Sequence, residues 1–210
     1  MKRIAVKTTI TAFIILVGIL TCIKPLYPNE QFLQHLGSLL LISILAIDLK
    51  RDRLKISSFI CLSLLIIIHI IGARYIYSYV PYNEWFKTIL HVDVTDLFQS
   101  DRNHYDRFVH LMFGMLIFPY LFQITGRDKA LKKMLRIFIV LCIIQTISMF
   151  YEVFEWFLTL VMSNEAANDY NGQQGDVWDA QKDMALAMLG SIIMAVLYMM
   201  KKEVKEESFG

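Results

Sequence analysis

The sequence predicts an all-α, polytopic membrane helix bundle with six transmembrane helices and both termini on the cytoplasmic side. Apolar residues make up 56% of the 210 residues and charged residues 19%, and the mean hydropathy is +0.49. Soluble chains average about 45–50% apolar and about 25% charged residues. The charges stand in blocks that leave long apolar runs between them, and Lys and Arg concentrate in alternate blocks.

These features exclude several classes of protein. The apolar runs are too many to be buried in one soluble core of this length, and their hydrophobicity excludes disorder. A net charge of +2 without a basic stripe argues against a nucleic-acid partner. The three cysteines, Cys22, Cys61 and Cys142, all lie inside apolar runs, so they indicate neither a disulfide framework nor a C-x-x-C metal site.

Six apolar runs are each expected to form one span of a single integral membrane domain. A bilayer core about 30 Å thick needs roughly 20 helical residues, so Lys and Arg beside the shorter runs are expected to snorkel. The first run follows Lys2 and Arg3 like a signal peptide but lacks a small-x-small cleavage site, so we expect a retained helix. The expected spans cover residues 8–23, 32–47, 56–73, 108–126, 137–158 and 184–200.

The segment 74–107 is expected to be a long outer loop. Its first part is rich in aromatic side chains, which typically anchor at the level of the lipid headgroups. Short helices lying on the membrane are expected over 85–90 and 92–98. The aromatic residues are Tyr75, Tyr77, Tyr79, Tyr82 and Trp85.

The charges are sorted by side. Fifteen of the 21 basic residues fall in the N-terminal segment, the second and fourth loops and the C-terminal tail, which predicts that these parts are cytoplasmic. Thirteen of the 19 acidic residues fall at or near the opposite side. Acidic residues contribute little to topology, so this excess reflects either solvation of the outer loops or a site.

The entrance to the fourth expected span carries the first candidate site residues, His104, Asp106 and His110. Asp106 and His110 are one helical turn apart and share a face. A carboxylate and imidazoles at this spacing suit a metal site or an acid–base pair. The alternative is a salt-bridged helix entrance in which Arg102 and Arg107 neutralise the aspartates.

The fifth span carries the second pair, Glu152 and Glu155. The charge-free stretch 137–151 has 15 residues, which is only about 22 Å of helix against a core of about 30 Å. The helix must therefore carry Glu152, and Glu155 with it, to the membrane boundary, unless it simply ends near Tyr151. Carboxylates within a span face the bundle interior and mark function.

The entrance to the sixth span carries Asp176, Asp179 and Asp183, spaced to lie on one helical face. Asp176 could be the N-cap of this helix, with Asp179 favoured by the helix dipole. Asp183 lies two turns further in, and capping does not account for it.

Three motifs stand in this order along the chain: Asn103-His104-Tyr105-Asp106-Arg107-Phe108-Val109-His110, Tyr151-Glu152-x-x-Glu155-Trp156 and Gln174-Gly175-Asp176-Val177-Trp178-Asp179-Ala180-Gln181-Lys182-Asp183. Together they closely resemble the YjdF-like family of bacterial inner-membrane proteins. This resemblance covers nearly the whole chain and implies an inner-membrane location and topology but no reaction. A few scattered residues, including Gly190 after the last aspartate, are also distantly similar to VanZ-like membrane proteins.

Three functions are consistent with these residues. The first is a membrane enzyme with an outward-facing site that acts on a lipid, a lipid-linked molecule or another small substrate, with a divalent metal as a possible cofactor. The second is a small proton-coupled transporter that uses Glu152, Glu155 and His110 as a relay. The third is a structural or assembly protein whose polar cluster locks the helices together. The sequence leaves the oligomeric state open. The expected metal ligands are Asp106, His110, Glu155 and Asp183.

Overall fold

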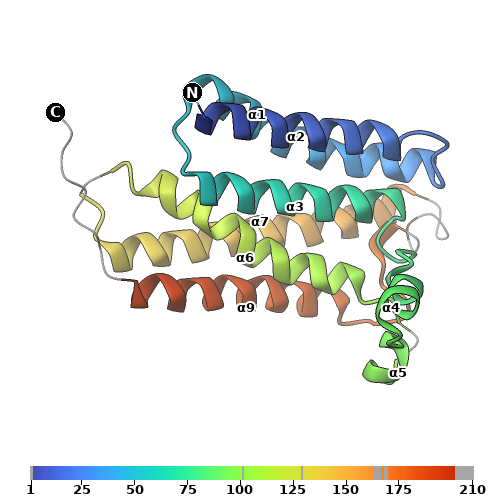
Figure 1. The fold of residues 1–210 in the computed structure, drawn as a ribbon. Helices are drawn as coiled ribbons and strands as arrows, with labels where there is room; N and C mark the ends of the chain where they lie inside the picture. The colour runs from blue at the N-terminus through green and yellow to red at the C-terminus, as the bar shows by residue number, and fades with distance from the viewer. Residues whose placement is uncertain (1, 101, 129, 163–166, 168–169, 202–210) are drawn as a thin grey trace.

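The computed structural model describes residues 2–100, 102–128, 130–162, 167 and 170–201. Asp101, Glu165 and Asp169, which belong to the acidic excess, lie outside these residues, as do Lys129, Lys202 and Lys205 of the basic blocks. Six long helices lie side by side, and the two short helices α4 and α5 are turned across one end of the bundle (Figure 1). The described helices are α1 (Lys2–Thr21), α2 (Pro28–Arg51), α3 (Ile56–Arg74), α4 (Tyr82–Leu90), α5 (Val94–Phe98), α6 (Tyr105–Thr125), α7 (Lys133–Val161) and α9 (Asp179–Met200).

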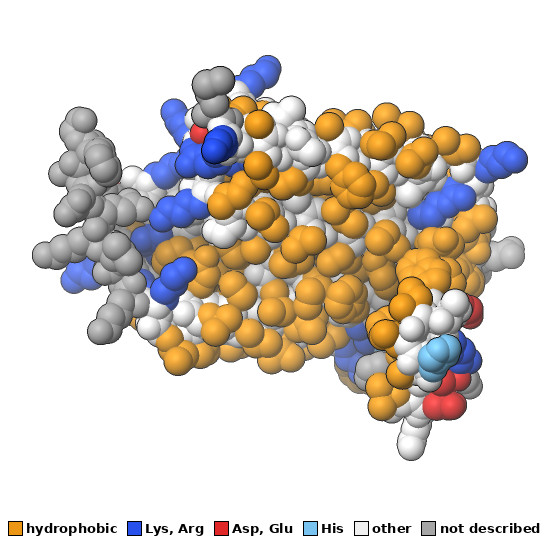
Figure 2. Space-filling model, viewed as in Figure 1, with side chains coloured by type: hydrophobic (Ala, Val, Ile, Leu, Met, Phe, Trp, Pro, Cys, Tyr) orange, Lys and Arg blue, Asp and Glu red, His pale blue; other side chains and the backbone are white. Residues whose placement is uncertain are grey.

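The prediction of an all-α bundle with six spans is confirmed. All six long helices have the length and composition needed to cross a membrane, and the described part of the chain contains no strand. Hydrophobic side chains cover the flank of the bundle, while Lys and Arg gather at the end that carries the N-terminus (Figure 2). Such a flank is stable only in an apolar solvent, since exposed apolar patches on soluble proteins are far smaller.

The bundle is built outward from α6. Helices α3, α7 and α9 pack directly on α6, and α1 and α2 pack on α3. The core between α6, α7 and α9 is closed by side chains that expose no surface, among them Phe118, Val140 and Ile144. The same apolar core continues along α3 through Ile66 and Ile70.

Several helices extend beyond the apolar runs. Helix α6 begins at Tyr105, so both Asp106 and His110 lie within its first two turns. Helix α7 continues unbroken through Glu152 and Glu155 to Val161, so it does not end near Tyr151. The backbone hydrogen bonds of a membrane helix have no competing water, which favours continuing a helix through isolated polar residues.

The aromatic loop differs in one respect from the expectation. Tyr79 and Trp85 are exposed, as interfacial anchors should be, but Tyr77 is only 5% exposed. Its ring packs where a side chain on Gly72 would clash at 2.8 Å, and its hydroxyl hydrogen-bonds His69. Burial raises the pKa of Tyr77 well above its usual range. The turn therefore folds this tyrosine back into the bundle.

Candidate functional site

Buried ionisable side chains from three helices meet at the α4 end of the bundle. Their side chains are between 2% and 8% exposed, so all are removed from solvent and lipid. We call this group the inner layer. Its members are Asp106 and His110 of α6, Glu152 and Glu155 of α7, and Asp183 of α9.

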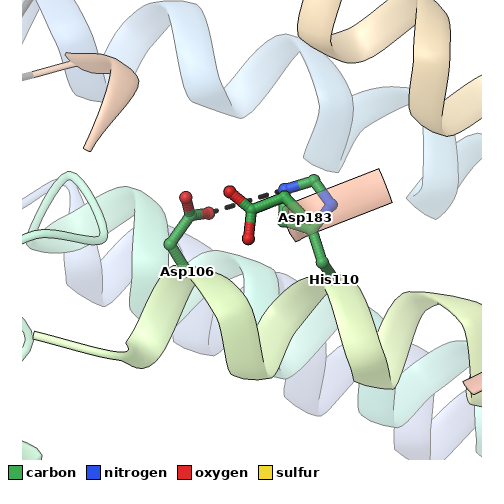
Figure 3. A group of neighbouring side chains, drawn as sticks. All are labelled: Asp106, His110 and Asp183. Atoms are coloured by element: carbon green, nitrogen blue, oxygen red, sulfur yellow. Dashed lines mark ion pairs between the residues drawn. The ribbon is translucent and has the colours of Figure 1, made fainter. Parts of the chain in front are cut away.

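Three members of the inner layer bring ligand atoms together. One ligand atom from each of Asp106, His110 and Asp183 lies within 4.8 Å of the other two. The three side chains come from α6 and α9 and gather at one point (Figure 3). His110 Nε2 lies 3.7 Å from Asp106 Oδ1, its neighbour one turn earlier on the helix.

Helix α7 adds Glu152 to this point. Glu152 Oε1 lies 3.4 Å from His110 Nε2, and the ring of Tyr151 packs edge-on against the imidazole with centroids 5.9 Å apart. Glu155, expected as a metal ligand, is buried one turn further along α7 but lies outside the three-residue group. Its backbone carbonyl accepts a hydrogen bond from Asn171 Nδ2 at 3.2 Å.

Glycines let α6 and α9 approach closely enough to form the cluster. A Cβ on Gly114 would lie 2.1 Å from the carbonyl oxygen of Ala187, and one on Gly190 would lie 2.2 Å from that of Leu111. Both distances are far inside van der Waals contact, so no larger residue fits this crossing. Gly172 has a different role: it lies in the left-handed region at φ 66°, which favours glycine, and a Cβ there would lie 3.3 Å from Ser78 Oγ and an ordinary 3.5 Å from Asp106 Oδ2.

A second group of charges, the outer layer, closes the cluster toward the loops. Arg102 Nη2 donates to Asp179 Oδ1 at 2.5 Å and to the carbonyl of Gly172 at 3.0 Å. Arg107 pairs with both Asp176 and Asp179. These arginines therefore neutralise aspartates from α9 and its leading loop. Asp101 of their own segment lies outside the described residues.

Asp176 is not the N-cap of α9. The N-cap is Trp178, and Asp176 accepts the backbone N–H of that residue at 3.1 Å while pairing with Lys182 at 2.5 Å. The contact with the Lys182 ammonium holds the pKa of Asp176 well below its usual range. The aspartate therefore stabilises the turn before the helix and stays ionised.

His104 lies at the N-cap of α6, apart from the inner layer. Its backbone N–H donates to the hydroxyl of Tyr82 at 2.9 Å. Burial, with a contribution from Arg107, lowers the pKa of its imidazole. The residue thus joins the start of α6 to α4.

The two layers differ in how their charge is balanced. Asp176 and Asp179 of the outer layer are paired with arginine or lysine. Among the described residues, the ion pairs of the inner layer involve His110 alone. Asp183 Oδ1 is buried and has no hydrogen-bond partner within the described structure. Glu152 Oε1 also makes no hydrogen bond there, and its ionic contact is with His110 Nε2 at 3.4 Å. A buried carboxylate oxygen left without a partner is costly, so this layer is suited to receive a cation.

Sequence reasoning missed how far the polar face of α7 extends. Ser148, one turn before Glu152, is 2% exposed and its hydroxyl has no hydrogen-bond partner in the described residues. The sequence could have indicated this position of Ser148, because residues four apart on a helix share a face and Ser148 precedes Glu152 by four. Gln145, a further turn toward the start of α7, also has a buried amide nitrogen without a hydrogen-bond partner among the described residues. Beyond it Val140 is fully buried and apolar, so the polar face ends within the bundle.

Comparisons with known proteins agree with the motif resemblance. Residues 6–203 match the model of the family described as "Predicted membrane protein (DUF2238)". The chain is 31% identical to "Inner membrane protein YjdF" of Escherichia coli (strain K12) over 131 residues, which is 62% of this chain and 58% of the relative. No solved structure matches. Because the family model spans almost the whole chain, the protein belongs to this family of membrane proteins.

Proposed function

We propose that the protein is a bacterial inner-membrane enzyme that holds a divalent metal ion in its inner layer and acts on a lipid or lipid-linked substrate. The observation that carries this proposal is the convergence of ligand atoms from Asp106, His110 and Asp183 within 4.8 Å. The bacterial inner membrane is supported by the relative's name.

The donor set suits a divalent transition metal. Imidazole nitrogen and carboxylate oxygens are common ligands of zinc and of related ions. Two ligands each about 2.1 Å from a tetrahedral metal stand roughly 3–3.5 Å apart, and Glu152 Oε1 lies 3.4 Å from His110 Nε2. Asp106, His110 and Asp183 would hold the ion with Glu152 as a fourth group. A bound ion would supply Lewis-acid activation of water or of a substrate oxygen.

The other candidate residues have supporting roles in this proposal. Asp176 and Asp179 are neutralised by arginine and lysine, so we assign them to holding the outer layer closed. Glu155 is a further buried carboxyl group beside the ligands. His104 links the site to α4 through Tyr82.

The lipid substrate is supported by the depth of the site. Trp156 directly follows Glu155 and is 61% exposed on the outer surface of α7. Tryptophan is enriched at the membrane–water boundary, so the inner layer is expected at headgroup depth. The apolar core beneath it, closed by Phe118 and Ile144, favours a one-sided site over a path across the bundle.

We also propose that both termini face the cytoplasm, so that the site faces the outer leaflet. Lys and Arg gather at the end of the bundle opposite α4 (Figure 2). Positive residues next to membrane spans favour the cytoplasmic side. This orientation makes the site accessible from the periplasmic side.

Elemental analysis of the purified protein tests the metal site. The wild-type protein should hold one divalent ion per chain, and Asp183→Asn should lose it because a neutral amide is a much poorer ligand. Glu84→Gln, which removes an exposed carboxylate at the same end of the molecule, should retain the ion. A folded wild-type protein without any stoichiometric metal would overturn the proposal.

Incubation with inner-membrane lipids tests the substrate class. Mass spectrometry of a lipid extract treated with the metal-loaded protein should reveal an altered headgroup or lipid-linked species. The change should be absent with Asp183→Asn and after chelation. If metal binding holds but no lipid changes, the metal site stands and the lipid substrate is wrong.

A further inference from the structure

Helix α4 has two chemically different sides. Tyr82, Trp85, Phe86, Ile89 and Leu90 share one side of the helix, because they are spaced three and four residues apart. The polar residues Asn83, Glu84, Lys87 and Thr88 share the other side. None of the nine residues of α4 is buried, although a helix with such a stripe normally turns it toward a core.

The polar side of α4 is occupied by contacts with the segment that follows it. Asn83 Oδ1 accepts the backbone N–H of Val94 at 2.7 Å, and its amide donates to Thr95 Oγ1 at 2.9 Å. Lys87 Nζ lies 2.6 Å from Asp93 Oδ2. These contacts fix which side of α4 faces α5, so the apolar side is left facing away.

The apolar side is strongly exposed. Ile89 is 74% exposed and Leu90 58%. Trp85 is held at the edge of the bundle by a ring contact with Tyr75, with centroids 6.1 Å apart. Figure 2 shows hydrophobic side chains of the part formed by α4 and α5 beside the apolar flank of the bundle, so the two surfaces are continuous.

The same end of the molecule exposes further apolar side chains. Val177 is 83% and Trp178 62% exposed just before α9, and Leu97 of α5 is 71% exposed. The chain has three tryptophans, and all three, Trp85, Trp156 and Trp178, are at least 40% exposed at this end. Tryptophans that form a ring at one level are typical of the membrane–water boundary.

We propose that α4 lies within the bilayer surface, with its apolar side inserted at the boundary between lipid headgroups and acyl chains. The occupant of this surface is lipid, because the surface continues the flank that the bilayer already covers. Helix α4 is turned across the long axis of the bundle (Figure 1), as a helix lying in the membrane plane must be if the long helices cross it. Its polar side faces the water-exposed loop.

This surface is joined directly to the candidate site. The hydroxyl of Tyr82 accepts the backbone N–H of His104, two residues before Asp106. Lipid contact at α4 thus holds the start of α6 in place. The lipid contact does not depend on the proposed metal ion, so each proposal can fail without the other.

Fluorescence quenching by brominated lipids tests the insertion of α4. The variant Trp156→Phe/Trp178→Phe keeps Trp85 as its only tryptophan and is reconstituted into bilayers. We expect phosphatidylcholine brominated high on the acyl chains to quench Trp85 more strongly than lipid brominated near the chain ends. An aqueous quencher should have little effect. If the double variant does not fold, the difference in quenching between the wild-type protein and Trp85→Phe reports the contribution of Trp85.

Matched variants on the two sides of α4 sharpen the test. Ile89→Asp should lower lipid quenching of Trp85 and raise aqueous quenching, because a charge is costly at that depth. Thr88→Asp on the polar side should leave both unchanged. Quenching by the aqueous reagent alone in the parent protein would mean that α4 is in water. Protection from both quenchers would mean that a protein surface, such as a second copy of the chain, covers it. Either result would overturn the proposal.

Discussion

Lys7 exposes none of its surface although it lies within a membrane-spanning helix. Its ammonium donates to Asp48 Oδ2 at 2.6 Å, to Asp52 Oδ1 at 2.8 Å and to the carbonyl of Leu54 at 2.8 Å. Asp48 also accepts the backbone N–H groups of Arg53 and Leu54. Contacts with Arg3 and Lys7 lower the pKa of Asp52 to about 2. This network ties α1 to the end of α2.

We predict that Lys7→Met destabilises the protein by about 3–5 kcal/mol, because it leaves Asp48 as a buried charge without its cation. Lys50→Met, which removes an exposed lysine near the same end, should change stability by less than about 0.5 kcal/mol. Unfolding in detergent micelles measures both. Equal stability of the two variants would mean that the buried pair contributes nothing.

The sequence identified Lys7 only as one of the basic residues that set orientation. Its spacing along α1 contains no information about Asp48, since the two residues are 41 positions apart and meet only when α1 packs near α2. The same holds for Arg102 and Arg107, whose partners lie 69 to 77 positions further along the chain. Ion-pair partners depend on tertiary packing, which a local pattern does not encode.

At the scale of the elements, the contact of α6 with α9 carries the candidate site. Gly114 and Gly190 stand where the two helices cross, and each faces backbone of the other helix. Small residues at a crossing let membrane helices approach closely. Asp106 and His110 are thereby brought to Asp183, so the geometry of the site depends on residues without side chains.

We predict that Gly114→Ala lowers stability by about 1–3 kcal/mol, the usual effect of overpacking, and weakens metal retention with it. The new methyl group would meet the carbonyl oxygen of Ala187 at 2.1 Å, so α6 and α9 must separate. Gly18→Ala is the matched control, because its methyl group meets only the Ile70 side chain at an ordinary 3.7 Å. Thermal unfolding and elemental analysis follow the two effects. A Gly114→Ala protein as stable as Gly18→Ala would contradict the assigned role of the crossing.

The helices themselves were predictable from the apolar runs, because a membrane helix satisfies its backbone within itself. The residues at which the helices begin were harder to predict. Helix α6 starts at Tyr105 and α9 at Asp179, in both cases before the apolar run, because charged residues that find partners continue the helix. The continuation of α7 through Glu152 and Glu155 was predictable, because the charge-free stretch before them is too short to span a bilayer alone.

At the scale of the whole molecule, acidic and basic residues concentrate at opposite ends of the bundle, and the candidate site lies at the acidic end. Buried carboxylates gather at the α4 end, while Lys and Arg gather at the end with the N-terminus (Figure 2). The sequence predicted that acidic residues would accumulate at one end. It could not predict that Arg107 would neutralise Asp176 and Asp179. Nor could it predict that, within the described structure, Asp106 and Glu152 would form ion pairs with His110 alone and that Asp183 Oδ1 would have no hydrogen-bond partner.

Accessibility to a membrane-impermeant thiol reagent measures the orientation of the whole bundle. In a background with Cys22, Cys61 and Cys142 replaced by alanine, Lys87→Cys should be labelled from outside in intact spheroplasts, because α4 is expected on the outer side. Lys201→Cys, at the end of α9, should be labelled only after the membrane is opened, because cytoplasmic positions are shielded. The opposite pattern would turn the candidate site toward the cytoplasm. It would also require the basic end of the bundle to violate the charge rule that orients membrane helices.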